Sequence, residues 1–412
     1  MSRPRRGRKY LIAMVGLPAR GKTFTARKLV GYLGWQGYPT RAFNVGEQRR
    51  ARLGRGQSHG FFDPGNREAV RLRRALADRV LDQACAWLRR EGRIAVLDAT
   101  HSTRARRKVI RERALAEDRE LLFVEIQNDE PEVVETNIRQ TKLRSPDYEG
   151  VPEELALQDF RRRIAHYARS YESLQEDEGP FVQLVDRGRK VVIHQVYGYV
   201  PGRVVFFLTN LQVTRRPIWL TRHGQSLFNL EGRVGGDSGL SPAGWEYART
   251  LARHVRETFP VGGNLDVWTS TLRRTLETAE PLGVEVGPWR ALDEIHAGEC
   301  DGLSYEEIRR RFPEEYAARQ RSKLDYRYPR GESYRDVIQR LDRVLIELER
   351  YRTPVLVIGH RAVLRAMVAY FRQLPLEEAP HLALPLHTLI KLTPTAYGCL
   401  EERVSLPPAV SE

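Results

Sequence analysis

The chain has 412 residues, of which 41% are hydrophobic and 29% are charged, and its formal net charge at pH 7 is +15. This length exceeds what one hydrophobic core usually supports, so we expect two domains of about 200 residues each. No apolar run approaches the roughly 20 residues that a membrane helix needs, and we therefore expect no membrane partner.

The three cysteines, Cys85, Cys300 and Cys399, lie far apart and form no metal-binding spacing. This usage is typical of a reducing cytoplasm without disulfides, so a cytoplasmic location is predicted. The excess of positive charge is mostly arginine and is spread through both halves. Because arginine binds phosphate and carboxylate in a forked geometry, small polyanions explain the charge as well as nucleic acid does.

A phosphate-binding loop is predicted near the N-terminus. The basic residues 1–9 are expected to form a disordered tail, and Tyr10–Val15 predicts a buried strand. The strand leads into a loop of the pattern G-x-x-x-x-G-K-[ST], and an amphipathic helix is predicted after it over Phe24–Leu33. The loop residues are Gly16, Leu17, Pro18, Ala19, Arg20, Gly21, Lys22 and Thr23. Backbone amides of such a loop hold phosphates, so Lys22 is expected to reach the β- and γ-phosphates of a nucleotide and Thr23 to bind Mg²⁺.

A carboxylate follows the second predicted strand, Ile94–Leu97, at Asp98. It can hold Mg²⁺ through water, or accept the proton of an attacking hydroxyl. It can also cap the helix predicted over Arg104–Ala116, and both interpretations stay open.

The other predicted elements of this half alternate between strands and helices. Strands are expected at Leu121–Ile126 and, as a hairpin, at Phe181–Val185 and Lys190–Val196. Helices are expected over Arg67–Arg90, Pro131–Lys142 and Pro152–Leu174, and loops over Asn44–Arg50 and Phe61–Asn66. Val204–Val213 is apolar and of ambiguous type. The alternation indicates an α/β fold with a parallel sheet of the nucleoside-kinase type.

The domain boundary is predicted at the polar segment Thr214–Pro217, which gives domains over residues 10–214 and 215–404 and a tail over 405–412. His223 then follows a short apolar run, Ile218–Leu220, where a strand is expected to end. Arg222 precedes it and a glycine follows, so an anion clamp lies beside a nucleophile. A lone histidine here would as readily be a capping or core residue.

Other candidate groups follow in this half. A helix capped by Ser241 is predicted to run to about Thr258, and the strand Asp266–Ser270 precedes a helix with Arg273 and Arg274. One of these two arginines is expected to face the phosphate and the other to be solvated. The strand Pro354–Gly359 delivers a second histidine, His360, at its end. Adjacent strands would bring both imidazoles and several arginines to one phosphoryl group.

This arrangement predicts covalent catalysis without a metal. His223 attacks phosphorus, while Arg222, Arg274 and His360 neutralise the charge that develops on the oxygens. Glu294, in a glycine-punctuated acidic loop, is expected to protonate the leaving oxygen and then to activate water.

Several segments, in order along the chain, resemble one family. They are Gly16–Thr23, Asp98–Thr100, Lys142–Tyr148, Arg233–Ser241, Tyr305–Ile308, Tyr326–Tyr334 and Pro385–Thr388. The chain resembles the bifunctional 6-phosphofructo-2-kinase/fructose-2,6-bisphosphatases from about residue 10 to residue 402. The resemblance implies a kinase that uses ATP and Mg²⁺ on fructose 6-phosphate. It also implies a C-terminal histidine phosphatase of the phosphoglycerate-mutase type that removes the same 2-phosphate, and it suggests a homodimer.

The resemblance also implies roles for individual residues. Asp98 assists at the sugar 2-hydroxyl and, with Thr23, at the metal, while Lys142 contributes to the kinase pocket. The residues implied to hold the sugar phosphate in the kinase half are Arg49, Arg73, Thr100, Arg106, Arg163 and Tyr167. Those implied to bind substrate in the phosphatase half are Asn229, Gly235, Tyr305, Arg327, Arg330 and Arg365. For each single arginine, a solvated surface position is the alternative.

The chain departs from the family pattern at five positions. The family usually has Asn at His101, Asp at His296, Gln at Arg361 and an acid at Gln225, and many relatives have Cys at Gln127. Two other functions are alternatives: a fusion that acts on nucleic-acid ends, and a regulatory nucleotide-binding protein with one degenerate site. Aromatic residues are not interleaved with a basic stripe, which is against nucleic acid.

Overall fold

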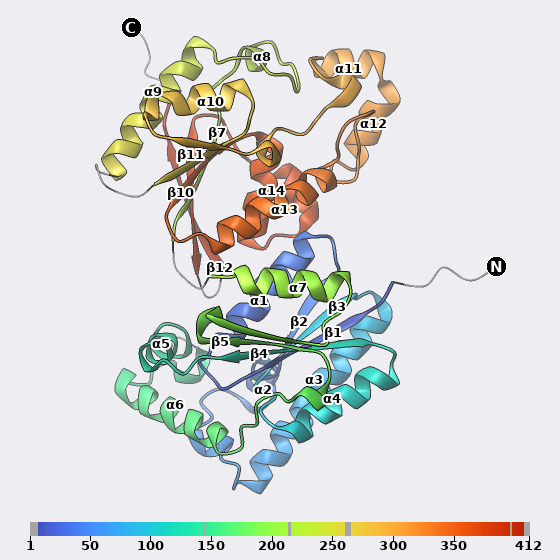
Figure 1. The fold of residues 1–412 in the computed structure, drawn as a ribbon, viewed down its shortest axis with the longest axis vertical. Helices are drawn as coiled ribbons and strands as arrows, with labels where there is room; N and C mark the ends of the chain where they lie inside the picture. Colours follow the sequence, from blue (N-terminus) through green and yellow to red (C-terminus); the bar gives the residue numbers. More distant parts are fainter. Residues whose placement is uncertain (1–6, 144, 213–215, 260–264, 396–397, 408–412) are drawn as a thin grey trace, which may run out of the picture. The chain divides into compact units, whose positions relative to one another are not determined.

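The computed structural model describes residues 7–143, 145–212, 216–259, 265–395 and 398–407. Contacts divide the chain into two compact units, Met1–Thr209 and Asn210–Glu412, and both are α/β (Figure 1). The domain boundary predicted at 214–215 lies outside the described residues, as do residues 1–6 and 408–412 of the predicted tails.

The N-terminal unit is built on a six-stranded sheet with the order β2-β3-β1-β4-β5-β6. The strands are β1 (Tyr10–Val15), β2 (Thr40–Asn44), β3 (Ile94–Asp98), β4 (Glu120–Gln127), β5 (Phe181–Val185) and β6 (Lys190–His194). Neighbours pair in parallel except β5 and β6, which form the predicted antiparallel hairpin. Both β1 and β3 are buried along nearly their whole length, as expected for central parallel strands.

Helices cover this sheet. They are α1 (Lys22–Trp35), α2 (Val45–Leu53), α3 (Arg67–Arg90), α4 (Arg104–Ala116), α5 (Pro131–Asn137), α6 (Glu153–Ala168) and α7 (Tyr199–Asn210). Apolar residues of α3 and α4, among them Leu81, Leu88 and Ile110, pack with Leu11 and Leu97 of the sheet in one core. Helix α7, whose type the sequence left ambiguous, stacks Phe207 on Tyr32 of α1 with ring centroids 4.3 Å apart.

The C-terminal unit has a second six-stranded sheet, with the order β12-β11-β7-β10-β8-β9. The strands are β7 (Ile218–Arg222), β8 (Asp266–Thr269), β9 (Val286–Pro288), β10 (Val355–Gly359), β11 (Thr388–Thr395) and β12 (Gly398–Ser405). The central strands β7, β10 and β8 are parallel, whereas β11 and β12 are antiparallel additions that the sequence did not predict. Adjacent β7 and β10 therefore end at the same edge.

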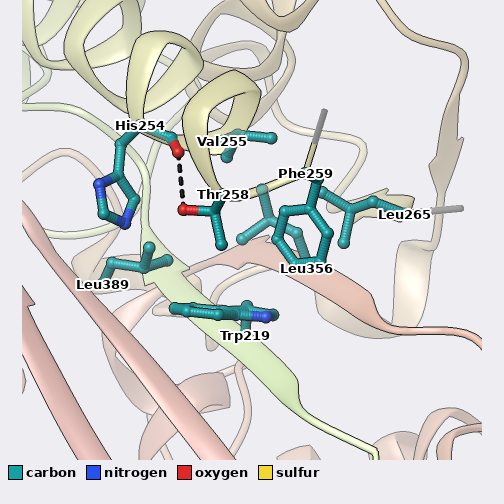
Figure 2. Close-up of a pocket in the computed structure, with 8 residues that line it drawn as sticks. All are labelled: Trp219, His254, Val255, Thr258, Phe259, Leu265, Leu356 and Leu389. Carbon is teal, nitrogen blue, oxygen red and sulfur yellow. Dashed lines mark hydrogen bonds between the residues drawn. The ribbon is translucent and has the colours of Figure 1, made fainter. Parts of the chain in front are cut away.

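Seven helices of the described C-terminal residues surround this sheet. They are α8 (Leu227–Leu230), α9 (Pro242–Thr258), α10 (Arg273–Ala279), α11 (Tyr305–Arg311), α12 (Pro313–Arg321), α13 (Tyr334–Arg350) and α14 (Arg361–Arg372). Helix α9 begins as predicted, because the Ser241 hydroxyl accepts from the Gly244 N–H and Pro242 occupies the first turn. A small apolar pocket lies where α9 meets the sheet (Figure 2). Trp219, Phe259 and Leu356 line it, so it belongs to the packing of this unit.

Three predicted elements were wrong in the N-terminal unit. Asn44–Arg50 is not a loop: it ends β2 and begins α2, with the Asn44 side chain accepting from the Glu47 N–H. The helix predicted to end at Leu174 ends at Ala168, because the Glu172 N–H bonds to the Ser102 carbonyl instead. The helix predicted over Pro131–Lys142 ends at Asn137 and continues as a π-turn.

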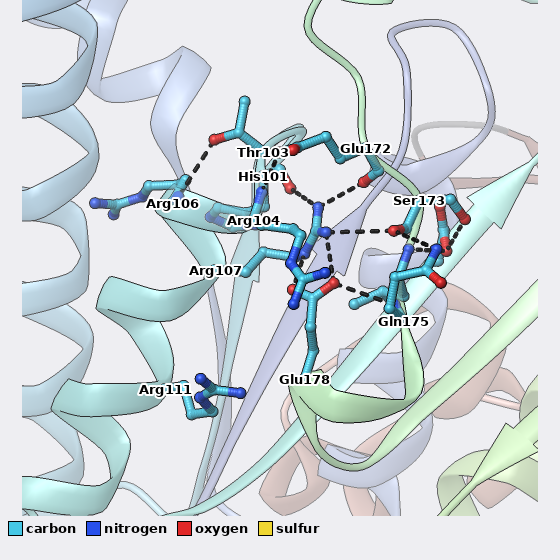
Figure 3. A network of polar contacts seen from close by, with 12 residues as sticks. His101, Thr103, Arg104, Arg106, Arg107, Arg111, Glu172, Ser173, Gln175 and Glu178 are labelled. Carbon is cyan, nitrogen blue, oxygen red and sulfur yellow. Dashed lines mark hydrogen bonds and ion pairs between the residues drawn. The ribbon is translucent and has the colours of Figure 1, made fainter.

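A buried ion pair explains where residues 172–178 lie (Figure 3). The Arg107 guanidinium forms a fork with Glu178, with both N–O distances at 2.7 Å, and these side chains are 0% and 5% exposed. Arg107 also donates to the carbonyls of Glu172 and His101, at 2.8 and 3.1 Å. One side chain thus ties the segment after β3 to the segment before β5.

Replacing Arg107 with alanine leaves the Glu178 carboxylate buried without its cation. We expect R107A to lower the free energy of unfolding of the N-terminal unit by about 3 kcal/mol, the usual cost of breaking a buried ion pair. Urea denaturation followed by circular dichroism measures this. Lys108, on the same helix and 65% exposed, is the matched control, and K108A should change the value by less than about 0.5 kcal/mol. Equal losses in the two variants would refute the explanation.

Candidate active sites

The phosphate loop lies at the carboxyl end of β1 and opens helix α1. Gly16 has φ 135°, and a Cβ there would come within 2.5 Å of the Ile126 carbonyl oxygen, so only glycine fits. Gly21, with φ 96°, precedes the first helical residue, Lys22. The buried Lys22 ammonium donates to the Leu17 carbonyl at 2.5 Å. Loop amides, a helix N-terminus and a lysine are thereby gathered at one strand end, which suits a polyphosphate.

Asp98 ends β3 beside this loop. Strands β1 and β3 pair in parallel, and the Gly16 N–H donates to the Thr100 carbonyl at 3.0 Å. The Asp98 carboxylate is buried and accepts from the Asn44 side-chain amide at 2.5 Å. Thr23 lies in the first turn of α1, so a carboxylate and a hydroxyl, both hard oxygen donors, occur on the elements that flank the loop. These residues fit a Mg²⁺ ion.

His101, where the family usually has Asn, is part of the same segment. It has φ 40° and its Nδ1–H donates to the Met14 carbonyl at 2.7 Å. Burial, followed by the charge of Arg106, lowers the pKa of His101 to about 3, so the imidazole is neutral. Asn and His both tolerate left-handed backbone, which explains why this departure leaves the turn intact.

Four of the residues implied to hold the sugar phosphate surround one aromatic ring, that of Phe62. The Arg163 guanidinium lies 3.7 Å from the ring centroid, and those of Arg49 and Arg73 lie 5.3 and 6.0 Å away. Tyr167 packs on the same ring at 5.8 Å. We call Arg49, Arg73, Arg163, Tyr167 and Phe62 the arginine cradle.

The cradle holds three cations with few anions, and the side chain of Arg49 is buried. Arg49 pairs with Asp147, yet its Nε and Nη1 and the Nε of Arg163 are buried without a hydrogen-bond partner. Burial lowers the pKa of Arg163, and the positive charge of Arg49 lowers it further. Buried guanidinium donors that lack acceptors are suited to an anionic ligand.

Among the described residues, no hydrogen bond, ion pair or ring contact joins the remaining predicted kinase residues to the cradle. Arg106 pairs with Asp78 on α3, and Thr100 offers its carbonyl to the phosphate loop. Lys142 closes the π-turn after α5, and its side chain lies outside the described residues.

His223 lies at the end of β7, buried between cations. Its Nδ1 is 2.7 Å from the Gly224 carbonyl, which can only accept, so Nδ1 carries the hydrogen and Nε2 has a free lone pair. Burial, followed by Arg274 and Arg222, lowers the pKa of His223 well below 6.5. The ring is therefore neutral, as a nucleophile must be.

His360 ends the neighbouring strand, β10, with its ring centroid 5.1 Å from that of His223. Its Nε2 lies 2.7 Å from the Ser270 hydroxyl, which in turn lies 2.8 Å from the Thr275 hydroxyl. Its Nδ1 is buried without a hydrogen-bond partner. Burial, with Arg274 and His223, also lowers the pKa of His360 well below its usual value.

The two arginines predicted beside the phosphate are both buried, Arg222 on β7 and Arg274 on α10. Burial lowers the pKa of Arg222 to about 10, so it is still charged at neutral pH. Arg274 donates to the Gly236 carbonyl at 2.6 Å, whereas Arg273 is 68% exposed and pairs with Glu277. Of the adjacent pair, Arg274 therefore points inward and Arg273 outward.

The loop that contains Gly235 and Gly236 is held between Arg274 and Asp301. The Asp301 carboxylate accepts from the Gly236 N–H at 3.1 Å. A Cβ at Gly235 would come within 1.8 Å of the Asp301 carboxylate, so Gly235 lets this loop close. Asn229 accepts from the Ser226 N–H as part of a capping box at the start of α8. Gln225, at a family departure, accepts from Ser241 at 3.0 Å.

Glu294 is anchored at the start of α14. Its Oε1 accepts from the Ile295 N–H at 2.9 Å and from the Ala362 N–H at 3.2 Å. Its charge raises the pKa of Arg222 and of Arg274, which places it near both. Arg340 binds the carbonyls of Asp293 and Glu294, at 2.6 and 3.2 Å, and fixes the loop.

The four other predicted substrate residues divide into two groups. Arg365 donates to the Leu382 carbonyl and to the Tyr334 hydroxyl, while Tyr305 accepts from Arg319. Arg327 and Arg330 are 61% and 86% exposed and pair with Asp336 and Glu299. These two belong to the surface in this structure.

Two cations that the sequence did not single out, Arg319 and Lys323, interact electrostatically. Burial lowers the pKa of Lys323, and the charges of Arg319, Arg365 and Arg361 lower it further. Arg361, at a family departure, is exposed at the start of α14. Since α12 and α14 are distant in the sequence, no local motif indicated this cluster. His296, another departure, contributes its backbone N–H to Glu332 at 2.9 Å.

A phosphate loop on the first strand of one sheet and a neutral histidine between buried arginines in the other define the class: a P-loop kinase unit joined to a histidine phosphatase unit. Residues 1–215 match the family model described as 6-phosphofructo-2-kinase, and residues 218–406 match the Histidine phosphatase superfamily (branch 1). In the part of the chain that the structure describes, no helix is long and apolar enough to cross a membrane.

Named relatives agree with these matches. A 6-phosphofructo-2-kinase/fructose-2,6-bisphosphatase of Gallus gallus is 47% identical over 96% of this chain and 84% of its own length. One from Arabidopsis thaliana is 46% identical over 98% of this chain, which spans 55% of that relative. A solved structure of a putative alpha-ribazole-5'-P phosphatase from Escherichia coli matches 48% of this chain and all of its own, with 22% identity and a TM-score of 0.42. The chain belongs to the bifunctional 6-phosphofructo-2-kinase/fructose-2,6-bisphosphatase family, and neither alternative function is favoured.

The lowered pKa values of His223 and His360 predict that both rings stay neutral well below pH 6.5 in the ligand-free protein. Nitrogen-15 NMR of the imidazoles, assigned with H223Q and H360Q, measures this. The unfolded chain takes up these protons near pH 6.5 and the folded chain does not, so stability falls as the pH drops below that value. H223Q should flatten the fall by up to about 1.4 kcal/mol per pH unit. A protonated His223 above pH 6 would contradict this.

Proposed function

We propose that the N-terminal unit transfers the γ-phosphoryl group of ATP to the 2-hydroxyl of fructose 6-phosphate, and that the C-terminal unit hydrolyses this 2-phosphate through a phosphohistidine. One observation carries the second activity: His223 is neutral, has a free Nε2 and lies among Arg222, Arg274 and His360. Family membership supports the pairing of the two activities.

In the phosphatase unit, Nε2 of His223 attacks phosphorus and the bond from phosphorus to the sugar 2-oxygen breaks. Glu294 gives its proton to that oxygen, and the product leaves as fructose 6-phosphate. The Glu294 carboxylate then takes a proton from water, whose oxygen attacks phosphorus and frees Nε2 as inorganic phosphate forms. Arg222 and Arg274 stabilise the charge on the phosphoryl oxygens, and the buried Nδ1 of His360 would bind one of them when protonated.

In the kinase unit, the amides of residues 16–23 bind the nucleotide phosphates and Lys22 stabilises the charge of the group in transfer. Asp98 accepts the proton of the sugar 2-hydroxyl as that oxygen attacks the γ-phosphorus. Thr23 and Asp98 would hold Mg²⁺, which shields the phosphate charges when it is bound. The arginine cradle binds the 6-phosphate, and its buried donors without partners support this assignment.

The substrate-binding assignments differ in their support. Arg365 and Tyr305, with Arg319 and Lys323, form the basic cluster that would hold the rest of the bisphosphate in the phosphatase unit. Asn229 and Gly235 would shape the phosphate site, and Thr100, Arg106 and Lys142 the kinase pocket. Arg327 and Arg330 would need to leave their carboxylate partners in order to bind the substrate. Homodimerisation and a cytoplasmic location stay predictions.

The two activities should be separable. We expect K22A to abolish ATP-dependent synthesis of fructose 2,6-bisphosphate and to keep its hydrolysis, because Lys22 belongs only to the phosphate loop. H223A should do the reverse and should lose the acid-labile phosphate that wild type acquires from labelled fructose 2,6-bisphosphate. Both rates are measured on one purified sample. If the two substitutions removed the same activity, two separate sites would be ruled out.

Adjacent arginines offer a matched pair. R274A removes a buried donor to the phosphoryl oxygens, and we expect kcat for hydrolysis to fall by about 10²-fold or more, the usual effect of deleting such a donor. R273A removes an exposed side chain and should stay within about twofold of wild type. Steady-state phosphate release gives both values. Equal effects of the two substitutions would contradict the assigned role of Arg274.

A further inference from the structure

A pair of histidines lies behind the arginine cradle and has no role in the proposed chemistry. His59 begins the short helix η1 (His59–Phe62), and its Nδ1 lies 3.1 Å from Nε2 of His166 on α6. The rings stack with centroids 5.4 Å apart and planes 13° apart. The Nδ1 of His166 is buried without a hydrogen-bond partner and lies 3.6 Å from the Asp63 carboxylate.

This pair joins the two segments that carry the cradle. Phe62 is on η1 with His59, whereas Arg163 and Tyr167 are on α6 with His166. Arg73 donates to the Phe62 carbonyl at 2.8 Å, so the position of η1 also sets the position of Arg73. If η1 moved away from α6, the Phe62 ring would therefore move with it. The guanidinium groups that pack around that ring would then lose their arrangement.

The hydrogen bond between the rings depends on protonation. With both rings neutral, one ring nitrogen donates and the other accepts. The first added proton is accommodated: His166 can donate from Nε2 to His59 while its Nδ1–H faces Asp63. A second proton puts a hydrogen on both Nδ1 of His59 and Nε2 of His166, the two nitrogens that face each other. The hydrogen bond between them is then lost, and the two imidazolium ions repel each other.

The charges around the pair favour the first proton. The hydrogen bond from the Gly65 N–H lowers the pKa of Asp63, and the charge of His166 lowers it further, so this carboxylate is ionised near neutral pH. From α6, Asp159 accepts from the His59 backbone N–H at 2.9 Å and from the Tyr148 hydroxyl at 2.8 Å. Arg73 on α3 and Arg169 at the end of α6 act on Asp63 and oppose a second proton.

We propose that His59 and His166 are positioning residues of the kinase site, and that a second proton on the pair releases η1 from α6 and weakens the binding of fructose 6-phosphate. The proposal rests on the proposed kinase function. It makes the binding of fructose 6-phosphate by the kinase unit sensitive to acid.

The test is the pH dependence of fructose 6-phosphate binding, as KM in the kinase reaction and as Kd by calorimetry. In wild type, both should be nearly constant from pH 8 to 6.5 and rise roughly two- to tenfold toward pH 5.5, the range that the loss of one net hydrogen bond gives. H166Q places an amide near the position of Nε2 of His166, and H59N places one near the position of Nδ1 of His59. Each variant keeps a hydrogen bond that does not titrate, so the rise should be smaller than in wild type while kcat is unchanged.

H166L removes the bond and should raise KM by a similar factor at every pH. His194, on the edge strand β6 and stacked on Phe181, is the matched control, and H194Q should keep the wild-type profile. The phosphate of the substrate titrates equally in all variants. Hydrolysis of fructose 2,6-bisphosphate by the same samples reports the folding of the C-terminal unit, and kcat of the kinase reaction reports that of the N-terminal unit.

Two results would overturn the proposal: H166Q and H59N retaining the full wild-type rise, or H166L leaving KM unchanged while hydrolysis is normal. Failure of the proposed function looks different. In that case wild type shows no ATP-dependent phosphorylation of fructose 6-phosphate at pH 7.5, and calorimetry shows no binding of it by any variant.

Discussion

Both sites depend on positive charge that the protein buries without a matching number of carboxylates. In the C-terminal unit, Arg222 and Arg274 are shielded from water beside two imidazoles, and the burial of His223, together with these two charges, keeps its ring neutral. In the N-terminal unit, Arg49 and Arg163 have buried donor atoms that lack acceptors. Such burial is costly for the ligand-free fold, and a phosphate offsets that cost when it binds. The same charge therefore supplies both affinity for phosphate and, at His223, the nucleophile.

The ends of parallel strands place these charges. Asp98 and the phosphate loop follow paired strands of one sheet, and His223 and His360 follow paired strands of the other. Neighbouring parallel strands end at one edge, so residues far apart in the sequence, such as His223 and His360, meet there. Smaller devices then fix the side chains. Gly224 sets the tautomer of His223, Ser270 holds His360, and Arg340 holds the loop of Glu294.

The elements that the sequence predicted most accurately are those that depend on a local pattern of residues. The strands before the phosphate loop and before His223 are apolar runs that end at glycine or charge, and both are found. Helix α2 was missed because its arginine-rich sequence has no apolar period, although the Asn44 cap was a readable signal. The strands β11 and β12, and the cluster of Arg319 and Lys323 with Arg365, depend on contacts between distant segments. No motif in one segment predicts such contacts.

Phe62 shows why a list of arginines is an incomplete description of the proposed phosphate site. Like-charged guanidinium groups repel one another when they are brought together out of water, and among the described residues only Asp147 pairs with one of the three in the cradle. The face of an aromatic ring attracts a cation without neutralising it. Arg163 lies at 3.7 Å from the Phe62 centroid, and Arg49 and Arg73 lie farther out around the same ring. The ring thus orders the cations and leaves their charge available for phosphate, which additional carboxylates would not.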